Sequence, residues 1–378
     1  MKRTPLATAA IVFAASTLAL SACGSDTTNT STTSGTELGA DAQAALDQSF
    51  EGISGDLQLD PVNVSQDVNL FVVSCGEQVP GCSTPAANVV EAGKAIGWKT
   101  TITDGKLNPE GFATAIRQAI AGGADVIVPI GIGCGVAQAA FQEANDAGIT
   151  VIGGGGVDDC SPKLWDSERL WIDGETPESQ WRGFGKLQAE YLTGKTNQQV
   201  KAVVLNFTGQ SWGPWITEGF TERLTELGGG DVVATVDVSD PEQADGSYLQ
   251  KVSTALLNHP EANAVVVPVD GWLATGLAQT IVQSGRDSEL FVIGRGGDAP
   301  VMDMIRQGDA GVDASVGFAV RWGAWGSVDT AARILDGQPA AWIGESIQTI
   351  DAEHNLPDSG DYDGAIDFES VFLEAWGK

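Results

Sequence analysis

The chain has 378 residues, of which 42% are apolar and 11 are tryptophan, so it is long enough and apolar enough to fill the cores of two domains. Acidic residues outnumber basic residues by 50 to 20, which gives a formal net charge of −30. A chain this acidic is not expected to bind nucleic acid, because nucleic-acid phosphates attract basic surfaces.

The first 22 residues predict a signal peptide. Two basic residues precede an apolar run that is too short to span a bilayer securely, and Leu20-Ser21-Ala22-Cys23 follows. This tetrapeptide resembles the lipobox of bacterial lipoproteins, in which the cysteine is acylated; the alternative is an ordinary secretory signal with a chance cysteine. We therefore expect a lipidated Cys23, an extracytoplasmic protein anchored to the cell membrane, and a flexible tether over residues 23–65, because residues 24–36 contain almost nothing that can be buried.

Strands and helices are predicted to alternate along the rest of the chain. Strands are expected over Val68–Val73, Trp98–Thr103, Val126–Pro129, Thr150–Ile152, Arg169–Asp173, Lys201–Phe207, Val232–Val238, Ala264–Val269 and Leu290–Gly294. Helices are expected over Ala86–Ile96, Pro109–Ala121, Thr176–Leu192, Trp215–Leu227, Pro241–Leu257, Leu273–Ser284, Pro300–Gln307, Trp325–Leu335 and Phe368–Trp376. Two α/β halves of similar make-up therefore follow one another.

The stretch from Ala124 to Gly156 is predicted to be a βαβ unit. Its two apolar runs flank an alanine-rich helix that ends at Gly148. Neither run alternates, which is typical of parallel strands covered on both faces. Ligands of such sheets bind beyond the carboxyl ends of the strands, so residues 131–134 and 153–160 are the first candidates for a site.

Cysteines are expected to form disulfides, because export permits them and lipidation of Cys23 leaves four of the five. Four cysteines allow three pairings. Cys75 and Cys82 share the loop after the first strand, whereas Cys134 and Cys160 follow the two strands of the βαβ unit, so we prefer the pairs Cys75–Cys82 and Cys134–Cys160. A zinc site is disfavoured, because the spacings are not CxxC and both histidines are far away in sequence.

The lipobox, the tether and the two α/β halves resemble the solute-binding lipoproteins of bacterial ABC importers, in the type I, sugar-binding branch. The stretches that carry the resemblance are GGADVIVPIGIG, ANDAGITVIGGGG, VVPVDGWLATGLAQTIVQSGR, ELFVIGRGGDAP and VDTAARILDGQP. The resemblance implies an α/β fold of two doubly wound parallel-sheet lobes, joined by a three-stranded hinge that closes over a ligand. The implied lobes are 66–174 with 320–345 and 175–319 with 346–378, and the implied partners of this monomer are ABC permease subunits.

Several of the family's sugar-binding positions are changed. Gly155 and Gly156 stand where a carboxylate is usual, Val269 stands in place of an asparagine, and Gly296 in place of an aspartate. The expected ligand is therefore an uncharged polyol or sugar derivative, larger than a pentose or differently oriented. Candidate ligand-binding residues are Gln78, Asp158, Asp159, Gln210, Trp212, Asp270, Trp272, Arg295, Asp298, Phe318 and Trp322.

Tryptophans at strand ends are expected to stack on the ligand. Trp212, Trp272 and Trp322 occur where apolar burial does not demand them, and indoles stack on sugar C–H faces. The other interpretation is that they belong to the core, which is the interpretation we prefer for Trp181, Trp215 and Trp325 on predicted helix faces.

Two other functions are left open. Residues 209–213, Gly-Gln-Ser-Trp-Gly, match the G-x-S-x-G nucleophile elbow, with His354 downstream, and this would make Ser211 a hydrolase nucleophile. The bulky Pro214 and Trp215 and the lack of a clearly placed base argue against it, so we expect no catalysis and no cofactor. The same lobes would also suit a binding-only sensory receptor.

Overall fold

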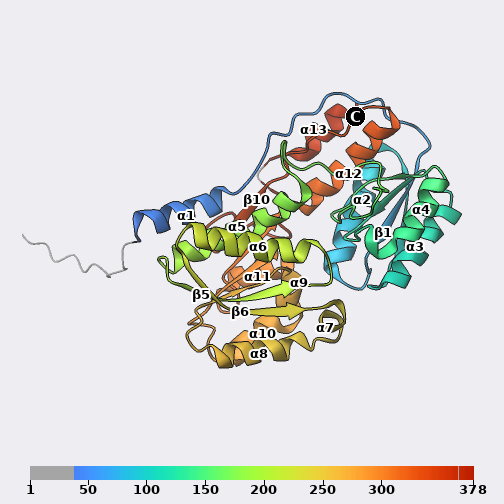
Figure 1. Cartoon of the computed structure of the whole chain (residues 1–378). Helices are drawn as coiled ribbons and strands as arrows, with labels where there is room; N and C mark the ends of the chain where they lie inside the picture. Colours follow the sequence, from blue (N-terminus) through green and yellow to red (C-terminus); the bar gives the residue numbers. More distant parts are fainter. Residues whose placement is uncertain (1–37, 365) are drawn as a thin grey trace, which may run out of the picture. The chain divides into compact units, whose positions relative to one another are not determined.

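The computed structural model describes residues 38–364 and 366–378 (Figure 1). The predicted signal peptide, the lipidation of Cys23 and the tether over residues 23–37 lie outside these ranges. Within the ranges, no helix combines the length and the apolar character needed to cross a membrane.

The first half of the chain forms a four-stranded parallel sheet in the order β2-β1-β3-β4. Its strands are β1 (Asn69–Ser74), β2 (Lys99–Asp104), β3 (Val126–Pro129) and β4 (Thr150–Val151). Its helices are α2 (Pro80–Ile96), α3 (Pro109–Ala121) and α4 (Gln138–Asp146), the last preceded by a 3₁₀ turn, η1 (Gly135–Ala137). Every residue of β3 is buried, and Gly148 ends the α4 region with a φ of +73°, so the predicted βαβ unit is confirmed.

The second half forms a six-stranded sheet in the order β10-β9-β8-β7-β5-β6, in which only the β10–β9 pairing is antiparallel among the described strands. Its strands are β5 (Val200–Phe207), β6 (Gly230–Val238), β7 (Ala264–Val266), β8 (Phe291–Gly296), β9 (Ala314–Phe318) and β10 (Ile347–Asp351). The helices that follow Thr176 are α5 (Pro177–Lys195), α6 (Trp212–Glu226), α7 (Asp240–Asp245), α8 (Tyr248–Asn258), α9 (Asp270–Trp272), η2 (Leu273–Leu277), α10 (Ala278–Gln283) and α11 (Ala299–Gln307). The predicted start of α5 is confirmed, because Thr176 and Ser179 cap it reciprocally.

Three predicted elements differ in the structure. The helix expected over Pro241–Leu257 is divided into α7 and α8, because Gly246 has a φ of +76° that a continuous helix does not contain. The helix expected over Leu273–Ser284 is kinked at Gly276. Residues 169–173 form no strand; they lie against residues 343–344, where the amide of Gly344 donates to the carbonyl of Trp171 over 2.6 Å.

The prediction of a flexible tether is wrong for residues 38–65. Helix α1 (Ala40–Glu51) packs on α5, where Gly194 has no side chain and so lets Leu46 approach closely. The chain then pairs Ile53 with Ile347 through two hydrogen bonds of 2.9 Å. Small buried residues on one face of α1 make this docking possible, and they give little hydrophobic signal in the sequence.

The chain end returns to the first half. Helix α12 (Val320–Leu335) packs on α2, and α13 (Phe368–Ala375) packs on α12. Trp376 Nε1 donates to the buried Oδ1 of Asp329 over 2.9 Å, and the two rings of Trp325 and Trp376 stack with centres 5.3 Å apart. The last helix, which the sequence analysis assigned to the C-terminal lobe, therefore lies on a helix assigned to the N-terminal lobe.

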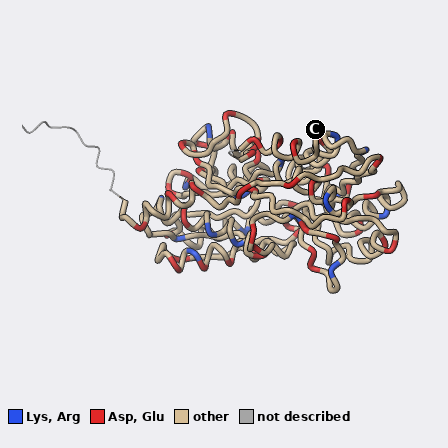
Figure 2. The backbone as a smooth tube through the Cα atoms, turned by 90° about the horizontal axis from the view of Figure 1, so that it is seen from above, with Lys and Arg blue, Asp and Glu red and all other residues tan. Residues whose placement is uncertain are grey.

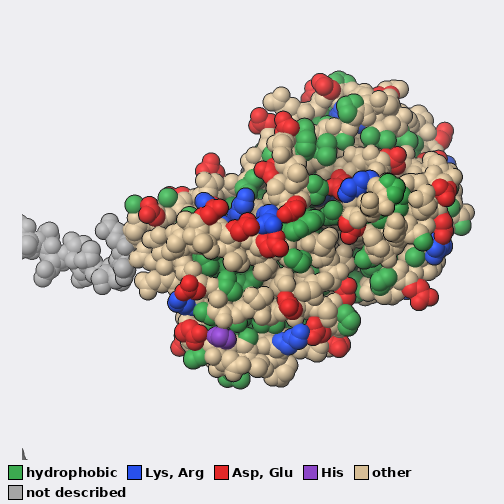
Figure 3. Space-filling view, in the orientation of Figure 1, with side chains coloured by type: hydrophobic (Ala, Val, Ile, Leu, Met, Phe, Trp, Pro, Cys, Tyr) green, Lys and Arg blue, Asp and Glu red, His purple; other side chains and the backbone are tan. Residues whose placement is uncertain are grey.

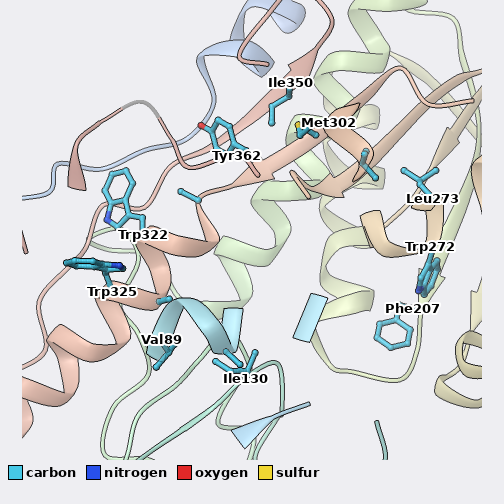
Figure 4. Packing of buried hydrophobic residues seen from close by; sticks show 14 of the residues in the cluster. Val89, Ile130, Phe207, Trp272, Leu273, Met302, Trp322, Trp325, Ile350 and Tyr362 are labelled. Atoms are coloured by element: carbon cyan, nitrogen blue, oxygen red, sulfur yellow. The ribbon is translucent and has the colours of Figure 1, made fainter. Parts of the chain in front are cut away.

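The largest buried cluster contains several tryptophans (Figure 4). Trp322 and Trp325 enter it from α12, whereas Trp272 enters from α9 and contacts Phe207. Acidic and basic residues are distributed over the described chain rather than gathered in one region (Figure 2). The space-filling view shows acidic and basic side chains next to one another on one face (Figure 3). Arg182, for example, forms ion pairs with Glu178, Glu218 and Glu222.

Candidate functional site

Arg295 lies in a box of aromatic rings. Its guanidinium carbon is 4.7 Å from the ring centre of Trp181, 4.9 Å from Phe184, 5.0 Å from Phe318 and 5.2 Å from Trp212. The box joins the end of β8 to α5, α6 and the end of β9. Each such contact stabilises a guanidinium by roughly 0.5–2 kcal/mol, which offsets part of the cost of burying the charge.

The guanidinium of Arg295 is free to donate. The side chain is buried, and none of its nitrogen atoms donates a hydrogen bond to the described residues. Burial lowers the pKa of Arg295 to about 10, while the charges of Asp270 and Asp298 act to raise it. Arg295 is therefore charged at neutral pH, and the rings hold its planar donor group in place.

Asp270 holds in place the turn that follows Arg295. Its Oδ2 accepts hydrogen bonds from the amide of Gly297 at 2.7 Å, from Ser315 Oγ at 2.8 Å and from the amide of Asp298 at 3.4 Å. A Cβ at Gly296 would lie 3.0 Å from the Cβ of Asp270, and the φ of Gly296 is +154°. The glycine that replaces the family's aspartate is thus required by the packing of Asp270.

Asp298 leaves its carboxylate uncommitted. It occupies the N-cap of α11, but the first amide of that helix, on Ala299, donates instead to Asp361 Oδ1 at 2.6 Å. Burial, together with the charges of Asp270 and Asp361, raises the pKa of Asp298 to about 7. Burial likewise raises the pKa of Asp270. Acceptor oxygens therefore lie close to the donor group of Arg295.

A second buried charge pair, Arg169 with Glu345, lies on two chain segments that run side by side. Arg169 Nη2 is 3.2 Å from Glu345 Oε2, and the two side chains are 6% and 0% exposed. Among the described residues, neither Glu345 oxygen and neither Nε nor Nη2 of Arg169 has a hydrogen-bond partner. Burial raises the pKa of Glu345 to about 7, which the charge of Arg169 opposes, and burial lowers the pKa of Arg169.

One aromatic stack connects the two arginines. The guanidinium carbon of Arg169 lies 5.2 Å from the ring centre of Trp171. Trp171 stacks on Phe318 with centres 6.4 Å apart and planes 21° apart, and Phe318 in turn contacts Arg295. The order is therefore Arg169, Trp171, Phe318, Arg295.

A small cavity lies beside this stack. Its volume is about 20 Å³, room for a water-sized group. It is lined by Gly155, Gly156, Glu168, Arg169, Trp171, Pro177, Gln180 and Trp181. The lining residues come from beyond β4, from the crossing segment and from the start of α5, which is the edge where the sequence predicted a site. A sugar is many times larger than a water molecule, so its entry here requires the lining elements to separate.

A larger depression lies elsewhere, along α8 on the open surface. Its volume is about 640 Å³, and Glu242, Lys251 and His259 are among its lining residues. It is wide open to solvent and contains no unpartnered buried group among the described residues, so it is a weaker candidate for ligand capture.

The structure brings together five of the predicted site residues: Trp212, Asp270, Arg295, Asp298 and Phe318. The others lie apart from this group. Gln78 is exposed in the loop after β1, Asp159 accepts a hydrogen bond from the amide of Gly135, Asp158 is buried under its own loop, and Gln210 accepts the amide of Gly213.

The expectation that Trp272 and Trp322 present free faces is wrong. Trp272 is 3% exposed, packs against Tyr248 and Phe207, and donates from Nε1 to Gln243 Oε1 at 2.9 Å. Trp322 is 2% exposed and stacks on Phe368. The core interpretation holds for both, because residues distant in the sequence cover them: Phe207 and Tyr248 in the case of Trp272, and Phe368 in the case of Trp322.

Four residues of this region were not predicted from the sequence: Arg169, Trp171, Phe184 and Glu345. Trp181 was expected to be a core residue only, but it also contacts Arg295 and lines the cavity. The signal that was available is the cluster of arginine and tryptophan at positions 169–171, which an ordinary short strand does not require.

Both predicted disulfides are present, Cys75–Cys82 and Cys134–Cys160. The one grouping of metal-ligand residue types in the described ranges is Cys134, Asp158 and Cys160. Its sulfur atoms are bonded to each other, and Asp158 already accepts hydrogen bonds from the amides of Leu164 and Trp165. These residues therefore do not form a metal site.

The G-x-S-x-G match has a packing explanation. A Cβ at Gly213 would collide with the carbonyl oxygen of Phe207, so the turn into α6 requires a glycine. Neither histidine of the chain accompanies Ser211: His354 stacks on Phe50 and contacts Asp351, and His259 contacts Glu261. No Ser–His pair is assembled, as nucleophilic catalysis of this type would require.

Solved structures with the same fold are periplasmic binding proteins. The 5-methylthioribose transporter solute binding protein from Thermotoga lettingae TMO is 18% identical with a TM-score of 0.64, over 84% of this chain and 95% of that one. An ABC transporter solute binding protein from Bacillus halodurans C-125 with bound myo-inositol is 18% identical with a TM-score of 0.62, over 77% and 96%. A galactofuranose binding protein is 16% identical with a TM-score of 0.62, over 82% and 99%.

At these identities the structures establish the fold alone. No curated protein sequence matches the chain. The model of the periplasmic binding protein domain, however, matches residues 72–339, which is most of the chain and includes strands β2 to β9. The chain therefore belongs to the periplasmic binding protein family, whose members bind solutes outside the cytoplasm.

Proposed function

We propose that this protein is the solute receptor of an ABC importer and captures a small, uncharged, hydroxyl-rich ligand, a sugar, polyol or sugar derivative, at the site of Arg295. The observation that carries the proposal is the buried guanidinium in its aromatic box, with no hydrogen-bond partner among the described residues. An unmet buried donor costs free energy, so a ligand that supplies an acceptor is favoured. The carboxylates of Asp270 and Asp298 supply acceptors beside it.

A ligand hydroxyl fits this arrangement because it both accepts and donates. It accepts from Arg295 and donates to Asp298, whereas a purely apolar ligand would leave both groups unpaired. The solved neighbours point to the same ligand class, since their bound molecules include 5-methylthioribose and myo-inositol.

A thermal-shift screen tests the proposal. The panel consists of galactose, glucose, mannose, arabinose, allose, myo-inositol, allitol and 5-methylthioribose, with amino acids as the control class. A bound ligand at 100 times its Kd adds about 2.7 kcal/mol to the free energy of unfolding, so a true ligand raises the melting temperature clearly. Stabilisation by amino acids and by no member of the panel would contradict the proposal.

We also propose that Cys23 carries a lipid and anchors the receptor to the membrane beside its permease. The support is the tetrapeptide Leu20-Ser21-Ala22-Cys23 after a short apolar run. Cell fractionation of wild-type protein and of Cys23→Ala checks it. The variant should appear in the soluble fraction; retention of the variant in membranes to the wild-type extent would contradict the lipid anchor.

A further inference from the structure

We propose that Arg169 is a second ligand-contacting donor, and that Glu345 cancels its charge so that the site accepts neutral hydroxyls and rejects carboxylates. This inference rests on the proposed function and adds to it a filter against charged sugars. Neither residue was expected at the site from the sequence, and both lie on segments that cross between the two halves of the fold.

Arg169 lies at the wall of the small cavity. Its side chain lines the cavity together with Trp171 and Trp181, yet it is only 6% exposed and donates no hydrogen bond to any described residue. Its guanidinium lies against the ring of Trp171, which fixes the plane of the group. A buried, oriented guanidinium that forms an ion pair with Glu345 but has unused hydrogen-bond donors is poised to bind an acceptor atom of a ligand.

Glu345 lies next to Arg169 but away from the cavity. It is fully buried behind Arg169, 3.2 Å away, and it does not line the cavity. Glu345 therefore acts through Arg169 and is a positioning residue. A Cβ at Gly323 would lie 2.6 Å from Nη1 of Arg169 and 2.8 Å from Oε1 of Glu345, so the absent side chain of Gly323 in α12 makes room for the pair.

The charges around Arg169 favour a neutral ligand over an acidic one. A lone buried guanidinium attracts a ligand carboxylate and forms a bidentate pair with it. Here that carboxylate is already supplied by the protein, and a second one, Glu168, also lines the cavity. An acidic sugar would bring a third negative charge into the same space. A hydroxyl, in contrast, accepts from Arg169 without adding charge.

The two segments that carry Arg169 and Glu345 connect the two halves of the fold. The amide of Ile343 donates to Leu170 at 3.0 Å, and the amide of Gly344 donates to Trp171 at 2.6 Å, so the segments of the pair are held together just beside it. A ligand atom bound to Arg169 thus contacts the connection between the two halves directly. The charge filter therefore lies where the elements that line the cavity have to move.

Matched sugars test the inference. Galactose, glucose and mannose are each compared with their uronates and their amino sugars, by calorimetric titration of the full chain at about pH 8, above the pKa of about 7 that burial gives Glu345, so that its carboxylate is ionised. The proteins are the wild type, Glu345→Gln, the double variant Arg169→Gln/Glu345→Gln, and Glu289→Gln as a control that neutralises an exposed carboxylate. Circular dichroism establishes that each protein is folded.

The wild type should bind a neutral sugar at least about tenfold more tightly than its uronate. In Glu345→Gln the affinity for the uronate should rise about tenfold relative to the affinity for the neutral sugar, because Arg169 is left without its ion-pair partner. A purely structural role of Glu345 would weaken both ligands alike. The double variant, which lacks the unpaired charge, should show no such gain, and the control should behave like the wild type.

Two results would overturn the inference. One is a wild type that binds a uronate as tightly as the matched neutral sugar. The other is a Glu345→Gln variant that still binds the neutral sugar and has the same ratio of neutral-sugar affinity to uronate affinity as the wild type. This second result would leave the proposed function intact. Failure of every neutral sugar and polyol to bind the wild type would instead overturn the proposed function together with the filter.

Discussion

The guanidinium of Arg295 lies 4.7 Å from the ring centre of Trp181, although the two residues belong to different elements, β8 and α5. The aromatic rings of this site therefore hold a protein side chain, and the arginine in turn presents the donors. This arrangement differs from the expectation that tryptophans alone form the binding surface. It makes the site depend on a charge that is buried and oriented but unpaired.

Replacement of Trp272 by alanine should destabilise the fold by about 3–5 kcal/mol, because its large buried side chain would leave a cavity between Phe207 and Tyr248. Urea denaturation measures the change. The half-buried Trp212 gives a matched variant, Trp212→Ala, for which a smaller loss is expected. A free energy of unfolding unchanged in Trp272→Ala would show that this indole is not part of the core.

Leu46→Ala should weaken the docking of α1 on α5 by about 2 kcal/mol, because Leu46 is 9% exposed and contacts the surface at Gly194. Amide hydrogen exchange of residues 42–50 measures the effect, and faster exchange is expected there than in α5. The exposed Glu51, changed to alanine, is the control. Fast exchange of these amides already in the wild type would restore the tether interpretation.

The disulfide Cys134–Cys160 should stabilise the protein by about 1 kcal/mol more than Cys75–Cys82, because it closes a loop of 26 residues rather than 7. Serine pairs at each disulfide, compared by urea denaturation, measure the difference. Thiol labelling of the unfolded, unreduced protein should find none of these four sulfurs reactive. A larger loss of unfolding free energy on removal of Cys75–Cys82 than on removal of Cys134–Cys160 would contradict the loop-entropy argument.

The stability of the fold should decrease as pH rises from about 4 to about 7. Burial raises the pKa of Asp298 from 3.8 and that of Glu345 from 4.5, each to about 7, so the folded state holds protons that the unfolded state releases. This contribution is complete below the ordinary pKa values and is lost as pH approaches about 7.

The comparison protein for this pH test is Asp298→Asn/Glu345→Gln, which has neither carboxylate. Its free energy of unfolding, measured in urea between pH 4 and pH 8, should rise relative to the wild type across that window. Parallel curves for the two proteins would show that the two carboxylates titrate in the folded state as they do in the unfolded state.

Much of the fold could be predicted because it depends on local patterns. A parallel βαβ unit is predicted within one stretch of sequence by the apolar runs of β3 and β4, the helix between them and Gly148. Helix α1 escaped prediction because its buried face consists mostly of small residues, Ala42, Ala45 and Ser49, whose value lies in close approach to α5. Such a contact is visible only when both helices are in place.

The site could be predicted only in part, for the same reason. Asp270 and Asp298 follow strands β7 and β8, and Arg295 lies in the last two residues of β8, at the edge where a parallel sheet concentrates ligand contacts. Arg169 and Glu345 are 176 positions apart and meet through crossing segments that carry no periodic pattern. Their pairing is a long-range consequence of the fold, and a single sequence does not encode it in any local motif.

The most direct test of the account is the affinity of the strongest neutral ligand of the sugar and polyol panel for wild type, Arg295→Lys and Arg295→Met, measured by calorimetric titration. Lysine keeps the charge but loses the planar donor group, and methionine loses both, so both variants should lose at least about tenfold in affinity, methionine the more. Unchanged affinity in both variants, with the fold intact, would contradict the central claim that Arg295 binds the ligand.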